Sequence, residues 1–193
     1  MGKLIAKWWL KLAGWTVDYT VPKEANHCVM IAAPHTTNWD FVYTRLAFYV
    51  LDIPMKIAIK DFWTKLFLVG WVIRALGGIG INRSPKKAGE QRRSMVEAMA
   101  EIIQQTDNIA MVIAVEGTRK PVKEWRMGFY HTAVQANVPI TLGYLDYEKK
   151  LAGVGIAVHP TGDVKADMKQ IMDFYKHIAP KYPQNFLLDE RYA

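Results

Sequence analysis

Residues 28–40, Cys-Val-Met-Ile-Ala-Ala-Pro-His-Thr-Thr-Asn-Trp-Asp, join a short apolar run to a polar turn, and the architecture can be read outward from this junction. The run Cys28–Ala32 is brief, apolar and contains Val and Ile, so it predicts a buried strand. Pro34 prevents a regular continuation of that strand, and residues 41–51 are long enough for a helix. His35 therefore lies between a strand and a helix, where α/β domains usually place their binding sites.

The alternation of strand and helix continues along the chain without repeats or a linker. Further strands are predicted at 55–59, 79–82, 109–115, 138–144 and 153–158, a turn or edge strand at 15–27, and helices at 3–13, 62–75, 86–105, 125–136 and 163–178. The uninterrupted apolar run at 109–115 is typical of a central strand buried on both faces. We therefore predict one α/β domain over residues 1–193, a layered fold with a mixed, mostly parallel sheet flanked by helices.

The charge of the chain limits its partners. The net charge is +7 and the pI about 9.4, which favours nucleic acid, an acidic membrane surface or phosphorylated small molecules. The basic residues are spread along the chain without a nucleic-acid-binding signature, so we expect no nucleic-acid partner.

The residue types that usually bind metals show no suitable spacing. The five histidines are scattered, so we expect no metal site. The single cysteine, Cys28, lies in an apolar run and is expected to be a buried, inert thiol.

The N-terminal segment has the composition of a membrane-surface helix. Lys3, Lys7 and Lys11 recur every four residues, and large apolar side chains fill much of the remaining circumference. This pattern predicts an interfacial amphipathic helix within residues 1–14 that binds an anionic membrane surface. The alternative is a terminal helix that docks its tryptophans on the core. No apolar run is long enough to cross a bilayer, so we expect a cytoplasmic protein, peripheral on the cytoplasmic face of the membrane.

His35 and Asp40 allow two interpretations. If His35 precedes the helix and Asp40 lies in its first turn, the carboxylate can accept a hydrogen bond from one imidazole nitrogen. The other nitrogen is then free to take a proton from a substrate hydroxyl. In the alternative, Thr37-x-x-Asp40 is a capping box that stabilises the helix start, and His35 is merely adjacent.

Further polar residues follow other predicted strands. Lys60 follows 55–59, Arg83 follows 79–82, and Glu116-Gly117-Thr118-Arg119 follows 109–115. Because ligands of open α/β sheets bind at the carboxyl ends of the strands, these loops are expected to share one rim with His35. Guanidinium groups there would suit a phosphate. The alternatives are that each cation is a solvated surface charge, and that Glu116 forms a salt bridge to one of the arginines.

Four motifs in order resemble the glycerolipid acyltransferases, of which the 1-acylglycerol-3-phosphate acyltransferases are the best-known members. They are the His-x4-Asp segment 35–40, the block 78–83, the segment 116–119 and Val-Pro-Ile at 138–140. The resemblance covers roughly residues 28–145. Gly80, Val115 and Leu142 depart from the family pattern, and these departures leave open a lysolipid acceptor with another polar head group.

The resemblance implies an O-acyltransferase that needs no cofactor and uses acyl-CoA or acyl-carrier protein as acyl donor and a lysophospholipid as acceptor. It implies that His35 is the general base and Asp40 its partner, and it places Pro139 and Ile140 near the acyl donor. The residues implied to organise the acceptor's phosphate are Arg83, Glu116, Gly117, Thr118 and Arg119, with Lys60 as a helper. The rival interpretation is a non-catalytic lipid- or membrane-binding module of the same fold.

Overall fold

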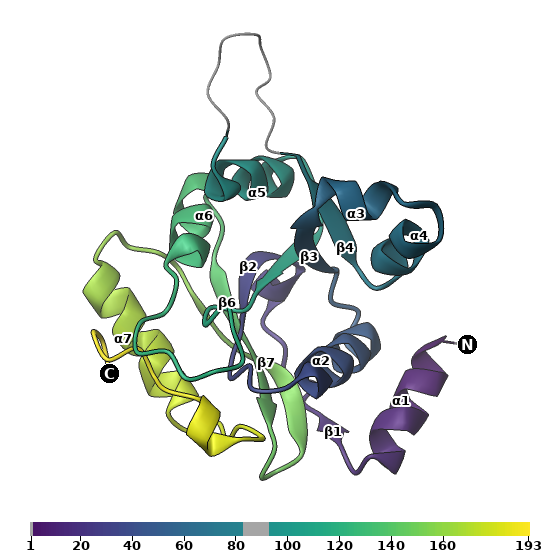
Figure 1. The fold of residues 1–193 in the computed structure, drawn as a ribbon. Helices are drawn as coiled ribbons and strands as arrows, with labels where there is room; N and C mark the ends of the chain where they lie inside the picture. The colour runs from purple at the N-terminus through teal and green to yellow at the C-terminus, as the bar shows by residue number, and fades with distance from the viewer. Residues whose placement is uncertain (1, 83–92) are drawn as a thin grey trace, which may run out of the picture.

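The computed structural model describes residues 2–82 and 93–193, and within them strands and helices alternate around one sheet (Figure 1). The strands are β1 (Thr16–Val17), β2 (His27–Ala32), β3 (Met55–Lys60), β4 (Gly78–Ile81), β5 (Ile109–Ile113), β6 (Ile140–Asp146) and β7 (Leu151–Val158). The α-helices are α1 (Gly2–Leu12), α2 (Asn38–Val50), α3 (Asp61–Lys65), α4 (Phe67–Ala75), α5 (Met95–Gln104), α6 (Gly128–Ala136) and α7 (Val164–Tyr175). Short 3-10 turns lie at Lys23–Asn26 and Pro183–Asn185.

The sheet is mostly parallel, as predicted. Its seven strands run in the order β1-β7-β6-β2-β5-β3-β4, and only the β6–β7 pair is antiparallel. Strand β2 lies between β6 and β5, with Ile31 opposite both Leu142 and Ile113. The carboxyl ends of β2, β3, β4, β5 and β6 therefore meet at one edge of the sheet, which is the shared rim that the sequence predicted.

Alternation along β2 builds the two halves of the core. Val29 and Ile31 pack into a cluster on the side of α5, α6 and α7, whereas Cys28 and Met30 pack into a second cluster with α1 and α2. A strand that is apolar at every position suits this place because helices cover both of its faces. Cys28 is fully buried, as predicted, and burial raises the pKa of its thiol to about 12.

The prediction of a single helix over residues 62–75 is wrong, because the segment forms two helices, α3 and α4. Leu66 has an extended backbone, with ψ 135°, between α3 and α4. A Cβ at Gly70 would lie 2.3 Å from the carbonyl oxygen of Thr64, so the missing side chain lets α4 lie against the end of α3. Apolar periodicity does not reveal such a break, which depends on a close backbone approach.

Two other helices begin later than predicted. Helix α5 starts at Met95, because Ser94 and Glu97 form a capping box, and residues 86–92 of the predicted helix lie outside the described residues. Helix α6 starts at Gly128 rather than at residue 125, since Trp125 packs in the core and its backbone N–H donates to Asp189.

Helix α1 confirms the predicted N-terminal helix. Ala6 and Leu10 are its buried residues, whereas Trp8 and Trp9 are exposed. The helix therefore packs on the core through small and aliphatic side chains, and its tryptophans do not dock there. Among the described residues, no helix is both long enough and apolar enough to span a bilayer.

Candidate active site

The His35 turn lies where β2 ends and α2 begins. Thr37 is the N-cap of α2, and the capping box between Thr37 and Asp40 is present. Asp40 is 4% exposed and its Oδ2 accepts hydrogen bonds from the backbone N–H groups of Thr36 (2.7 Å) and Thr37 (2.9 Å). The carboxylate is thus fixed by the first turn of the helix.

The same oxygen of Asp40 also faces the imidazole. His35 Nδ1 lies 3.4 Å from Asp40 Oδ2, and the His35 side chain is 20% exposed. The capping box and the approach of the carboxylate to His35 therefore coexist, since one carboxylate caps α2 and also faces the imidazole. A carboxylate beside Nδ1 favours the tautomer with its proton on Nδ1, which leaves Nε2 unprotonated.

Tyr147 is the residue of this site that sequence reasoning missed. Its hydroxyl donates a hydrogen bond to Asp40 Oδ1 at 2.6 Å. Tyr147 follows β6 directly, and β6 is parallel to β2, so its position obeys the rule that singled out Lys60 and Glu116. The signal in the sequence was weak: a polar aromatic three residues after the predicted strand 138–144 and one residue after the observed end of β6.

Glu116 supports the His35 turn from the adjacent strand. Its Oε1 accepts a hydrogen bond from the backbone N–H of His35 at 2.9 Å. The side chain is buried, and Oε2 has no hydrogen-bond partner among the described residues. Within the described part of the chain, Glu116 forms no ion pair with an arginine, so its observed partner is the turn itself.

Glu116→Gln is expected to change how stability depends on pH. Burial raises the pKa of Glu116 above its ordinary value of 4.5, so the folded protein holds this proton to higher pH than the unfolded chain does. The native free energy of unfolding should therefore fall, relative to that of the variant, as pH rises from 4.5 through the folded pKa. The expected slope is at most about 1.4 kcal/mol per pH unit. Chemical denaturation at several pH values measures the difference, and a constant difference would contradict the assignment.

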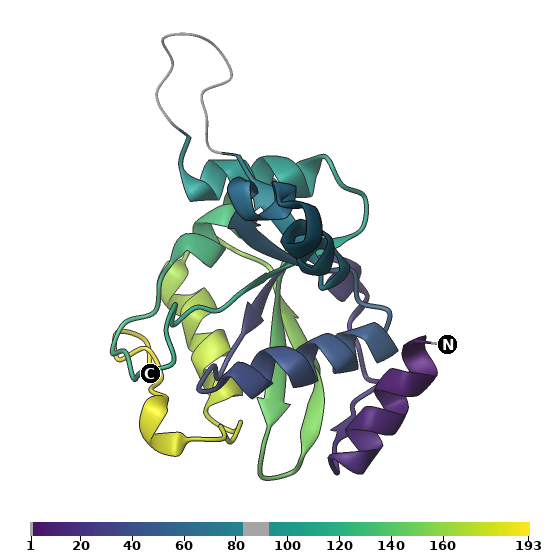
Figure 2. The same ribbon diagram turned by 45° about the vertical axis from the view of Figure 1, so that its right-hand side comes forward.

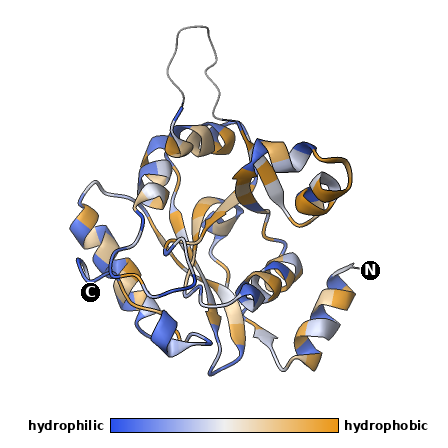
Figure 3. Ribbon diagram, in the orientation of Figure 1, coloured by the Kyte–Doolittle hydropathy of each residue, from blue (hydrophilic) through white to orange (hydrophobic). Residues whose placement is uncertain are grey.

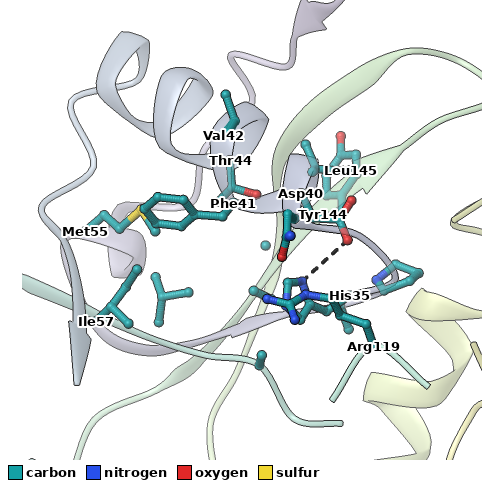
Figure 4. A pocket seen from close by; sticks show the side chains of 17 residues that line it. His35, Asp40, Phe41, Val42, Thr44, Met55, Ile57, Arg119, Tyr144 and Leu145 are labelled. Carbon is teal, nitrogen blue, oxygen red and sulfur yellow. Dashed lines mark ion pairs between the residues drawn. The ribbon is translucent and has the colours of Figure 1, made fainter. Parts of the chain in front are cut away.

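A pocket of about 540 Å3 opens beside His35, between α2 and the sheet (Figure 4). His35, Asp40 and Arg119 lie at one end, and Phe41, Met55 and Ile57 lie at the other. The remaining lining residues, mostly apolar or small, are Ala32, Ala33, Pro34, Asn38, Val42, Thr44, Val112, Ala114, Gly143, Tyr144 and Leu145. The pocket thus joins a polar end that holds an imidazole, a carboxylate and a guanidinium to an apolar end.

The residues implied for phosphate binding are distributed unevenly around this pocket. Arg119 lines it, whereas Glu116, Gly117 and Thr118 precede Arg119 in the same loop and are not among the lining residues. Gly117 has φ +64°, and a Cβ there would lie 2.7 Å from Arg126. Thr118 Oγ1 accepts from the backbone N–H of Lys120 at 3.3 Å. Lys60 is exposed at the end of β3 and does not line the pocket, and Arg83 lies outside the described residues.

The last motif lies at the opposite end of its strand from the pocket. Ile140 is fully buried and pairs with Val29 near the start of β2. The pocket instead contacts residues 143–145, farther along β6. Residues 138–140 therefore contribute to the core, and the strand that they begin reaches the site three residues later. No group of three His, Cys, Asp or Glu residues suited to a metal ion occurs within 2–82 and 93–193.

Two kinds of comparison with known proteins find similarity to this chain. The family model described as "Acyltransferase" matches residues 17–141. The crystal structure of the 1-acyl-sn-glycerophosphate (LPA) acyltransferase PlsC from Thermotoga maritima matches with a TM-score of 0.52 and 14% sequence identity. That match covers 90% of this chain and 74% of the other, and it shows a common fold. No curated protein sequence matches this chain.

The family model spans the His35 turn, the β3 and β4 strands and the Glu116 loop, which is well over half of the chain. It therefore includes His35, Asp40 and Arg119, the polar residues that meet at one end of the pocket. This chain is a member of the acyltransferase family.

Proposed function

We propose that this acyltransferase moves a fatty acyl group from a thioester donor, acyl-CoA or acyl-carrier protein, to the hydroxyl of a lysophospholipid such as 1-acylglycerol-3-phosphate. The observation that carries the proposal is the His35–Asp40 pair at the polar end of an otherwise apolar pocket. The pair supplies a base, and the pocket supplies a place for a hydrocarbon chain.

His35 acts as the general base in this proposal. Nε2 takes the proton of the acceptor hydroxyl while the oxygen attacks the thioester carbon, and a tetrahedral oxyanion forms. Collapse of that intermediate breaks the C–S bond, and the imidazolium returns the proton to the departing thiolate. Asp40 stabilises the imidazolium, because its carboxylate faces Nδ1. In the sequence, neither Ser84 nor Ser94 lies in a nucleophile-elbow motif, so in this proposal attack is direct and no acyl-enzyme forms.

The shape of the pocket fits the two ends of a lipid. A volume of about 540 Å3 lies within the range of about 300–1,000 Å3 that is usual for small-molecule sites. Phe41, Met55 and Ile57 would contact the acyl chain, while Arg119 would bind the phosphate of the acceptor. On sequence grounds we assign Lys60 and Arg83 as additional cations for the same head group, with Glu116, Gly117 and Thr118 organising the loop.

A screen of donors and acceptors tests the function. The purified chain is given acyl-CoA or acyl-carrier protein together with lysolipids that carry phosphate, phosphoglycerol, phosphoethanolamine or phosphocholine head groups. We expect transfer with the phosphate monoester to be fastest, because Arg119 can bind its oxygens bidentately. Arg119→Ala should raise KM for that acceptor about tenfold and leave KM for the donor nearly unchanged. Failure of the native protein with every pair would favour the non-catalytic lipid-binding module.

Helix α1 is proposed to hold the enzyme on the cytoplasmic face of an anionic membrane. Lys7→Gln and Lys11→Gln together are expected to weaken binding to anionic vesicles about fivefold for each charge removed. The matched control is Lys165→Gln with Lys169→Gln on α7, which lies across the molecule from α1 (Figure 1). Vesicle sedimentation measures both, and equal losses in the two variants would show a general effect of net charge rather than a role for α1.

A further inference from the structure

The α3–α4 unit, residues 61–75, presents an apolar surface at the β4 edge of the sheet. Six of its large apolar side chains are between 47% and 90% exposed: Phe62, Trp63, Phe67, Leu68, Trp71 and Val72. Figure 3 shows the same segment as predominantly hydrophobic. An exposed cluster of this size usually marks an interaction surface.

The local structure fixes these side chains outward. The buried residues of α3 and α4 are Thr64 and Gly70, so small groups form the contact between the two helices. Arg74 donates a hydrogen bond to the carbonyl oxygen of Thr64, which ties the end of α4 back to α3. The break at Leu66 thus turns a run of apolar residues into a compact unit whose large side chains face away from the core.

The charges around this surface favour an anionic lipid over an apolar protein partner. Residues 60–76 contain Lys60, Lys65 and Arg74 but a single acidic residue, Asp61, and that residue pairs with Lys65. Tryptophan and phenylalanine beside lysine are the residues that accumulate at membrane interfaces.

The position of the unit adds a geometric reason. In Figures 1 and 2, α4 and α1 lie on the same side of the molecule, with α2 between them. Helix α3 follows directly from β3, whose Met55 and Ile57 line the apolar end of the pocket. A flat partner that contacts both α1 and α4 would therefore also cover α2. It would then face the apolar end of the pocket.

We propose that α3 and α4 insert their apolar face into an anionic bilayer and, together with α1, seat the enzyme with the apolar end of its pocket toward the lipid. The inference rests on the proposed function for its lipid substrate, which would enter the pocket from the bilayer without crossing water. Binding of the bilayer itself requires no acyl transfer and is measured separately.

The test compares two pairs of substitutions with equal change of charge. Phe67→Asp with Leu68→Asp places two charges on α4, where the native side chains are 90% and 73% exposed. The control, Val134→Asp with Ile156→Asp, changes exposed apolar residues on α6 and β7. Sedimentation uses vesicles of equal parts phosphatidylglycerol and phosphatidylcholine. We expect the α4 pair to lose at least about thirtyfold in vesicle affinity and the control pair to lose several times less.

Activity separates this proposal from the function. The α4 pair should keep native transfer to a short-chain, water-soluble acceptor and lose transfer to a lysolipid embedded in vesicles. If the native protein binds vesicles but transfers no acyl group to any acceptor, the proposed acyltransferase function is rejected, while the proposal that α3 and α4 bind the bilayer is retained. Equal losses of vesicle affinity in the two pairs would overturn the proposal that α3 and α4 bind the bilayer. The proposal would also be overturned if the α4 substitutions left vesicle binding unchanged and instead dissociated a dimer of the native chain, because the apolar surface would then be a protein interface. If the α4 pair fails to fold, Trp71→Ser, at a side chain 67% exposed, replaces it, and the control is then Val134→Ser, at a side chain 52% exposed.

Discussion

Replacing His35 by alanine is expected to lower kcat for acyl transfer by a factor on the order of 10²–10⁴. Among the described residues that line the pocket, no other side chain is an imidazole that could take the hydroxyl proton next to the Asp40 carboxylate. The fold should survive, because the His35 backbone N–H still donates to Glu116. Steady-state kinetics at saturating donor and acceptor measure the loss.

The control for this substitution is His131→Ala. His131 is exposed on α6 and does not line the pocket, so its replacement should leave kcat within about twofold of native. Native activity in the His35 variant would remove the imidazole from the mechanism. Equal losses in the His35 and His131 variants, with lower thermal stability in both, would point to folding instead of chemistry.

The position of the site could be predicted from the sequence because its residues all obey one rule. His35, Glu116 and Arg119 follow apolar runs that become neighbouring parallel strands, so strand recognition alone places them at one rim. The unbroken apolar run at 109–115 likewise predicted that β5 would be a central strand of the sheet, buried on both faces. These inferences needed only the period of the hydrophobic pattern and the direction of the strands.

What the sequence could not predict depends on contacts between distant residues. Glu116 could have paired with an arginine, and only the fold shows that it holds the His35 backbone. The break at Leu66 depends on the approach of Gly70 to Thr64. Lys60 is the last residue of β3, yet it does not line the pocket, because the rule predicts the edge of the sheet but not the direction of a side chain.

Asp40→Asn separates the two roles that the sequence could not distinguish. Oδ2 accepts from two backbone N–H groups, so the asparagine oxygen is expected to take that position and keep the cap of α2. The amide nitrogen then faces the Tyr147 hydroxyl, which can accept as well as donate. The free energy of unfolding should therefore change by less than about 1 kcal/mol. With no negative charge to stabilise the imidazolium, kcat should fall by a factor on the order of 10²–10⁴.

Tyr147→Phe provides the graded comparison, because it removes a single hydrogen bond and keeps the charge of Asp40. Oδ1 of the buried carboxylate loses the donor at 2.6 Å, so the free energy of unfolding should fall by about 1–3 kcal/mol. The expected loss in kcat is about tenfold, since the carboxylate still faces His35 but is less firmly held. The two variants are therefore expected to rank in opposite orders for activity and for stability. Asp40→Asn should have the lower kcat, and Tyr147→Phe should have the lower free energy of unfolding. Full activity in Asp40→Asn would show that Asp40 serves only as the cap of α2. The carboxylate would then have no part in the reaction that we assign to His35.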